Sequence, residues 1–369
     1  MKRLVVMVTI GCMLCVLCVQ ACAITDIQTA QLEAYGVSEL EKELPEEAYQ
    51  VWGDVTVKDA SQPQTLLQTL WEKLTGSPQE LLSSALNNAA VILLMCFVIA
   101  VVQTMPMDSG QAKLCSMIGA VSVTLVCMHE ASGCVPMGFQ VIETLSDFSG
   151  KLLPALCAAA AAGGAVTSAG AKYAFASVTL DLLNTVMLNL MRPAFTLYIT
   201  AVAAGNVLQN EVLLSLTGFL KRMLRLLLIG TAILFTGYLT LTGILNGAVD
   251  KTAAKAAKTT ISAALPVVGK ILSDAAETVV SGAGILRTGI GSLGLLCVLA
   301  VCVVPYASLG VHYLIYQLIG GFISAFSDKR IAALLQGFSD VYAMMLGAAG
   351  TVTFVLFASI VSLMQAVSL

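Results

Sequence analysis

Long apolar stretches follow one another from residue 86 to the end of the chain, and charged residues are sparse among them. Three of these stretches, at residues 86–104, 225–247 and 341–366, are long enough to cross a hydrocarbon core, which takes about 20 apolar residues in a helix. A helix that is apolar on all sides is buried in protein or lies in lipid. The pattern therefore predicts an all-α, polytopic transmembrane helical bundle.

We expect about seven to nine spans in this bundle, with re-entrant or broken helices among them. The candidate spans are residues 86–104, 114–128, 152–170, 173–191, 194–208, 226–247, 292–309, 310–326 and 341–366. Residues 129–150 contain acidic residues but no Lys or Arg, which predicts a loop outside the cytoplasm. Lys221, Arg222 and Arg225 predict a cytoplasmic anchor. Beyond residue 250 the alternation of sides becomes ambiguous.

The front of the chain has a different character. Residues 1–23 have the three parts of a secretory signal peptide: Lys2 and Arg3, an apolar run, and the small-residue site Ala21-Cys22-Ala23. An uncleaved first transmembrane helix and a lipoprotein with Cys22 lipidated remain as alternatives. Residues 24–85 hold eleven acidic residues against three lysines, which predicts an acidic, helical, extracytoplasmic segment. Residues 86–369, with fourteen basic and eleven acidic residues, form the predicted membrane domain.

The composition of the chain argues against several classes of function. Hydrophobic residues make up 58% of the chain and charged residues 11%, against roughly 25% charged residues in soluble domains. No basic patch supports a nucleic-acid partner. The two histidines, at positions 129 and 312, are too few for a histidine metal site. The G-x-G-x-x-G pattern at residues 289–294 opens an apolar span and lacks the βαβ context of a dinucleotide site. We therefore predict no enzyme activity, catalytic residue, cofactor or metal.

Polar residues at membrane depth are the more informative candidates, because an ionisable group there usually faces a partner or a watery cavity. Asp181 and Asn184 are three residues apart and share a helix face. They are candidates to line a conduit or to couple to a cation or proton, unless their helix lies on the surface and Asp181 faces water. Lys270, Asp274 and Glu277 share a second face, which lines water in a re-entrant segment or faces solvent on an amphipathic helix.

Two stretches of the chain look alike. Residues 153–170 and 265–284 each open with Leu-Pro and close with a cluster of Ser, Gly and Ala. Gly/Pro-marked segments in matching positions of two halves are typical of the broken helices at a transport site. The alternative, which the composition favours, is that both are small-residue helices that pack closely.

Three motifs carry a family resemblance. They are LLPALCAAAAAGGAVTSAG at residues 152–170, LPVVGKILSDAAETVVSGAGILRTGIGSLG at 265–294 and SDKRIAALLQGFSDVYAMML at 327–346. Together with the order of signal, extracytoplasmic segment and many spans, they resemble the bacterial stage III sporulation protein AE family over about residues 86–365. Residues 24–85 and 129–150 carry no matching motif.

The resemblance implies a role in endospore formation. It implies an integral membrane subunit of a channel or secretion-like complex that links the mother cell to the forespore, placed in the outer forespore membrane. The implied partners are ring-forming membrane proteins and a cytoplasmic ATPase, and the implied task is to form or gate a conduit. Two rivals remain: an autonomous secondary transporter with Asp181 as its coupling residue, and a scaffold that conducts nothing.

Overall fold

The computed structural model describes residues 85–102, 109–208, 210–245, 268–324 and 329–365, together with residues 45, 83 and 105. Within these ranges every regular element is a helix, which confirms the predicted all-α class. The predicted signal peptide and nearly all of the predicted acidic segment lie outside the described residues.

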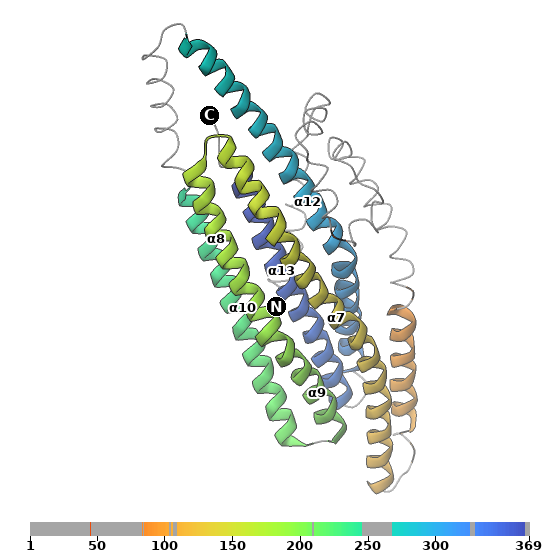
Figure 1. Ribbon diagram of the computed structural model, residues 1–369. Helices are drawn as coiled ribbons and strands as arrows, with labels where there is room; N and C mark the ends of the chain where they lie inside the picture. Colours follow the sequence, from red (N-terminus) through yellow and green to blue (C-terminus); the bar gives the residue numbers. More distant parts are fainter. Residues whose placement is uncertain are drawn as a thin grey trace.

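The described helices form an elongated bundle (Figure 1). After the helix Ala85–Val102, the elements are α7 (Ser109–Ala162), α8 (Val166–Thr185), the π-helix η1 (Val186–Met191), α9 (Arg192–Leu208), α10 (Glu211–Leu245), α12 (Val268–Ile323) and α13 (Lys329–Met364). In the described ranges, five helical stretches are long and apolar enough to cross a membrane: Ala85–Val102, Leu114–Ala162, Val166–Leu208, Gly282–Ile323 and Arg330–Met364. The expected seven to nine spans are therefore not confirmed.

The predicted loop at residues 129–150 is wrong, because this segment lies inside the 54-residue helix α7. Glu130 and Ser149 are buried, but the exposed residues of this segment recur every three or four positions and so occupy one helix face. Phe139, Ile142 and Leu145 lie between them in sequence and are buried. The loop prediction failed because it considered only the charges of this segment and not the helical spacing of its residues.

Two other predicted boundaries also lie inside continuous helices. The candidate spans 173–191 and 194–208 join through η1 into one helical stretch. The candidate 292–309 and residues 310–323 of the next candidate are part of α12, which continues through Pro305. The 56 residues of α12 rise by about 84 Å, whereas a hydrocarbon core is about 30 Å thick. If it lies along the membrane normal, α12 therefore extends well beyond a single crossing.

The first of the two similar stretches contains a turn, but not at its proline. α7 continues through Pro154 and ends at Ala162, and Gly163 and Gly164 form the turn into α8. Gly164 has φ +91°, a backbone conformation that costs other L-residues roughly 1–2 kcal/mol. A Cβ atom at Gly163 would lie 3.7 Å from the Cβ atom of Ala283 in the second stretch. The two small-residue segments thus approach each other, as the close-packing alternative expects.

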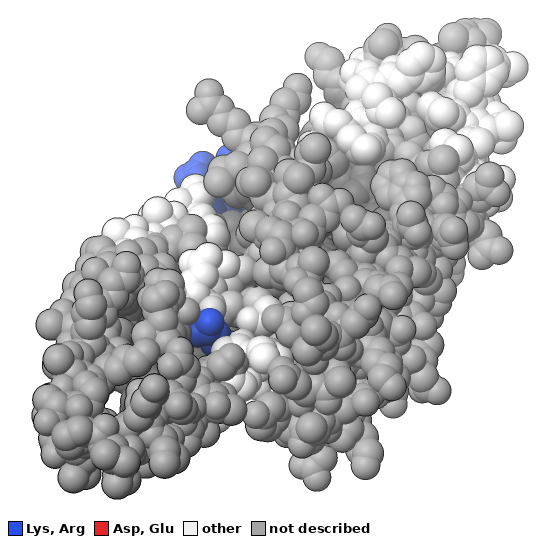
Figure 2. Space-filling view, turned by 90° about the horizontal axis from the view of Figure 1, so that it is seen from above, with Lys and Arg blue, Asp and Glu red and all other residues white. Residues whose placement is uncertain are grey.

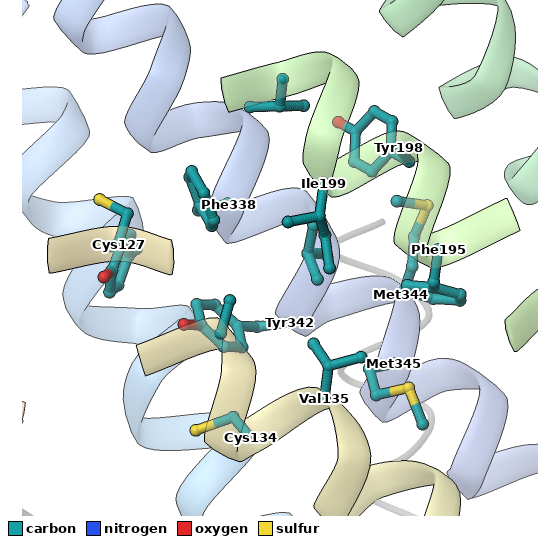
Figure 3. Packing of buried hydrophobic residues seen from close by; sticks show 14 of the residues in the cluster. Cys127, Cys134, Val135, Phe195, Tyr198, Ile199, Phe338, Tyr342, Met344 and Met345 are labelled. Carbon is teal, nitrogen blue, oxygen red and sulfur yellow. The ribbon is translucent and has the colours of Figure 1, made fainter. Parts of the chain in front are cut away.

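The core lies where α7, α12 and α13 pack together, and α9 covers one side of it (Figure 3). Glycines allow this close approach. A Cβ atom at Gly138 would lie 2.6 Å from Met345 Cγ of α13, and one at Gly294 would lie 2.5 Å from Leu152 Cδ2 of α7. Seen from above, the described surface is largely uncharged, with Lys and Arg only in small patches (Figure 2).

Candidate functional site

A buried ion pair joins α10 to α13. The Lys221 ammonium group donates a hydrogen bond to Asp340 Oδ2. The Asp340 side chain is 1% exposed, whereas that of Lys221 is 32% exposed. Asp340 Oδ1 has no hydrogen-bond partner in the described structure. Since a buried carboxyl group is costly without a partner, Lys221 supplies the partner that Asp340 needs between these helices.

A second polar contact joins α7 to α12. The Tyr316 hydroxyl group donates a 2.5 Å hydrogen bond to Glu130 Oε2, and both side chains are buried. Tyr316 also packs against Tyr342 of α13, with ring centroids 5.3 Å apart. The other carboxyl oxygen of Glu130 has no hydrogen-bond partner among the described residues. A carboxyl group thus lies at the meeting point of the three core helices.

A cysteine and a histidine meet close to this carboxyl group. Cys134 Sγ of α7 lies 3.7 Å from His312 Nδ1 of α12, and Figure 3 shows Cys134 beside Tyr342. His312 Nδ1 also lies 2.8 Å from the Ser308 carbonyl oxygen, to which its N–H can donate. Cys134 is 6% exposed and belongs to the hydrophobic core, so solvent has little access to its thiol. We interpret the contact as structural.

Lys172 connects α8 to the end of α13. Its side chain is 2% exposed, and its Nζ donates a 2.9 Å hydrogen bond to the Ser362 carbonyl oxygen. Ser362 lies in the last turn of α13, where the helix dipole favours a positive charge. This lysine therefore holds the start of α8 against the C-terminal end of α13.

The structure separates the two residues of the first predicted group. Asp181 is exposed on α8. Asn184 is buried, and its Nδ2 donates a 2.6 Å hydrogen bond to Ser146 Oγ of α7. Asn184 therefore joins two helices, whereas Asp181 lies exposed on the surface of the bundle.

The other predicted residues lie on α12 and α10. Lys270, Asp274 and Glu277 are in the first part of α12, and their side chains lie outside the described set. On α10, Arg222 and Arg225 are exposed. Their neighbour Lys221 instead turns inward to Asp340.

Comparison with known proteins identifies the family. The family model for stage III sporulation protein AE matches residues 54–367, which is most of the chain and includes every site described above. This chain belongs to the stage III sporulation protein AE family. It is 21% identical over 338 residues to the stage III sporulation protein AE of Bacillus subtilis (strain 168), and the match covers 85% of this chain and 84% of that protein. No solved structure matches this chain.

The residues that sequence reasoning missed in this AE-family chain are Glu130, Lys172 and Asp340. Glu130 lies in the segment wrongly predicted as a loop, and Asp340 lies within a motif used only for the family resemblance. A single ionisable residue inside an apolar stretch was the available signal for Lys172 and Asp340. Their partners are distant in sequence: 190 positions separate Lys172 from Ser362, and 119 separate Lys221 from Asp340.

We expect Tyr316→Phe to lower the free energy of unfolding by about 1–3 kcal/mol, because it leaves Glu130 buried with neither oxygen hydrogen-bonded. The double variant Tyr316→Phe/Glu130→Leu is the matched control and should recover most of this loss, because it removes both polar partners together. Thermal unfolding of the protein purified in detergent measures both. Equal destabilisation by the two variants would show that the loss does not come from the unpaired Glu130 carboxyl group.

Proposed function

We propose that this protein is an integral membrane subunit of the channel or secretion-like complex that links the mother cell to the forespore, where it forms or gates a conduit. Membership of a sporulation family supports the process, and five membrane-length apolar helices support the location in a membrane. We place it in the outer forespore membrane. Its proposed partners are ring-forming membrane proteins and a cytoplasmic ATPase, and the exposed Arg222 and Arg225 are candidates to contact the ATPase.

The conduit part of this proposal depends on one observation. Arg192 of α9 and Glu143 of α7 form a 2.5 Å ion pair whose side chains are 51% and 44% exposed, although both helices are apolar enough to cross a membrane. A half-exposed ion pair is unfavourable in contact with hydrocarbon and favourable beside water. The centre of the bundle is filled by fully buried side chains such as Tyr316, Phe338 and Tyr342. A conduit would therefore run along the outer face of this subunit.

The first test is purification of the tagged protein from cross-linked sporulating cells. We expect the ring-forming membrane proteins and the ATPase to co-purify. Replacing Arg222 and Arg225 with glutamate should release the ATPase alone, and the matched change Lys151→Glu, on α7, should not. Recovery of the protein without these partners, or its presence in vegetative cells alone, would contradict membership of the complex.

Two side-chain changes separate the two rivals of the conduit, the transporter and the scaffold, from each other. Asp181→Asn and Glu277→Gln should abolish solute movement if the protein is an autonomous transporter, while assembly of the complex survives. Both changes should be silent if the protein is a scaffold that conducts nothing.

A further inference from the structure

The outward face of α10 carries exposed apolar side chains from residue 212 to residue 233. Its four most exposed large apolar side chains are Val212, Phe219, Leu226 and Ile233, at 75%, 61%, 69% and 65%. They follow one another at intervals of seven residues, about two turns, and therefore share one side of the helix. Leu224, on the other side, is buried where α10 packs on α9 and α13. In Figure 1, α10 lies along one edge of the bundle.

Two arginines interrupt this face near its centre. Arg222 lies three residues after Phe219 and four residues before Leu226, which places it on the same face, and Arg225 lies directly beside Leu226. Both arginines are exposed. Within the described ranges, neither of them forms an ion pair. The face therefore presents apolar residues, then two cations, then apolar residues again.

A lipid bilayer alone does not satisfy this arrangement at any depth. From Val212 to Ile233 the face rises by about 30 Å, which is the thickness of one hydrocarbon core. If the whole face lay in hydrocarbon, the arginines would stand near the middle of the core without an anion, which is costly. If the arginines lay among the headgroups or in water instead, the apolar residues on at least one side of them would stand outside the lipid. Exposed apolar patches of that kind mark protein contacts.

We propose that a helix of a partner protein packs along this face of α10, and that this helix is apolar and carries carboxyl groups opposite Arg222 and Arg225. The inference rests on the proposed function, in which these arginines are candidate contacts of the ATPase, and it extends that contact to the apolar residues on both sides of them. Arginine and carboxylate form strong, charge-assisted hydrogen bonds. The α10 helix of a second copy of this chain is a poor match, because it would bring arginines against arginines.

Site-specific photo-crosslinking in sporulating cells tests this surface. A benzophenone amino acid replaces Phe219 on one side of the arginines or Ile229 on the other. The matched control is Leu318 of α12, which is 71% exposed in a segment without charged residues. We expect both α10 positions, but not the control, to form an adduct with the same protein. Arg222→Gln/Arg225→Gln should lower the yield of both adducts at least about tenfold at unchanged abundance of this chain.

Mass spectrometry of the adducts locates the partner segment, which we expect to be an apolar helix with Asp or Glu. In the Arg222→Glu/Arg225→Glu background the adducts should disappear, and changing those partner acids to lysine should restore them. Adducts with lipid alone, with a second copy of this chain or at only one α10 position would overturn the inference. So would a segment without carboxyl groups or a yield that ignores the arginines. Co-purification of the ATPase is scored separately, so missing adducts in an intact complex refute this surface and not membership of the complex.

Discussion

Replacing Lys221 with methionine is expected to lower the free energy of unfolding by about 3–5 kcal/mol, because the change leaves the Asp340 carboxylate buried without a cation. The Asp340 side chain is 1% exposed, and its Oδ1 has no hydrogen-bond partner in the described structure. The expected loss is large beside the total stability of a typical protein, about 5–15 kcal/mol. Denaturant unfolding in detergent, together with the abundance of the protein in membranes, measures the effect.

Three further variants make this prediction specific. Asp340→Asn should cost less than Lys221→Met, because Lys221 is 32% exposed and its ammonium group can turn toward water. The double variant Lys221→Met/Asp340→Leu should recover most of the stability, since apolar residues often replace a buried ion pair without loss. Arg222→Met, at the adjacent exposed position, should change little. A double variant as unstable as Lys221→Met would refute this account of the pair.

Local pattern was sufficient for the class of fold and for the family. The apolar stretches predicted an all-helical membrane body, and the motifs beginning with Leu-Pro identified the stage III sporulation protein AE family, which the family match confirms. The number and the limits of the spans were predicted less well, because loops were placed wherever charged residues occurred along the chain. Glu143 and Asp147 suggested a loop, although in α7 they lie on a partly exposed face of a continuous helix.

The polar contacts inside the bundle were less predictable than the fold. Asp181 and Asn184 were paired by their spacing, but the fold turns Asn184 inward to Ser146 and leaves Asp181 exposed. Lys221 was grouped with Arg222 and Arg225 as an anchor, yet it pairs with Asp340, 119 positions away. Spacing along one helix shows which side chains share a face. Which residues of other helices contact that face depends on tertiary packing, which the spacing does not reveal.

The triple variant Gln140→Leu/Thr185→Leu/Thr196→Leu should reduce heat-resistant spores to the level of cells that lack the protein. Apolar side chains on a conduit wall expel water and close the path by dewetting. The three positions are exposed, so leucine creates no overpacking in the core. We therefore expect normal abundance in the membrane and normal co-purification of the partners. Spore counts and quantitative blotting of the same cultures measure the two effects.

Two matched triple variants decide whether the loss comes from polarity. Serine at the same three positions keeps contact with water and should sustain spore formation. At neighbouring exposed apolar positions, Val178→Leu/Leu182→Ile/Leu197→Ile changes shape but not polarity and should also be tolerated. Normal sporulation by the leucine variant would show that no step depends on water at these three positions, in favour of a scaffold. If only the leucine variant fails to sporulate while its complex stays intact, the result supports a conduit. A scaffold would hold its partners equally well in the leucine variant and in the two control variants.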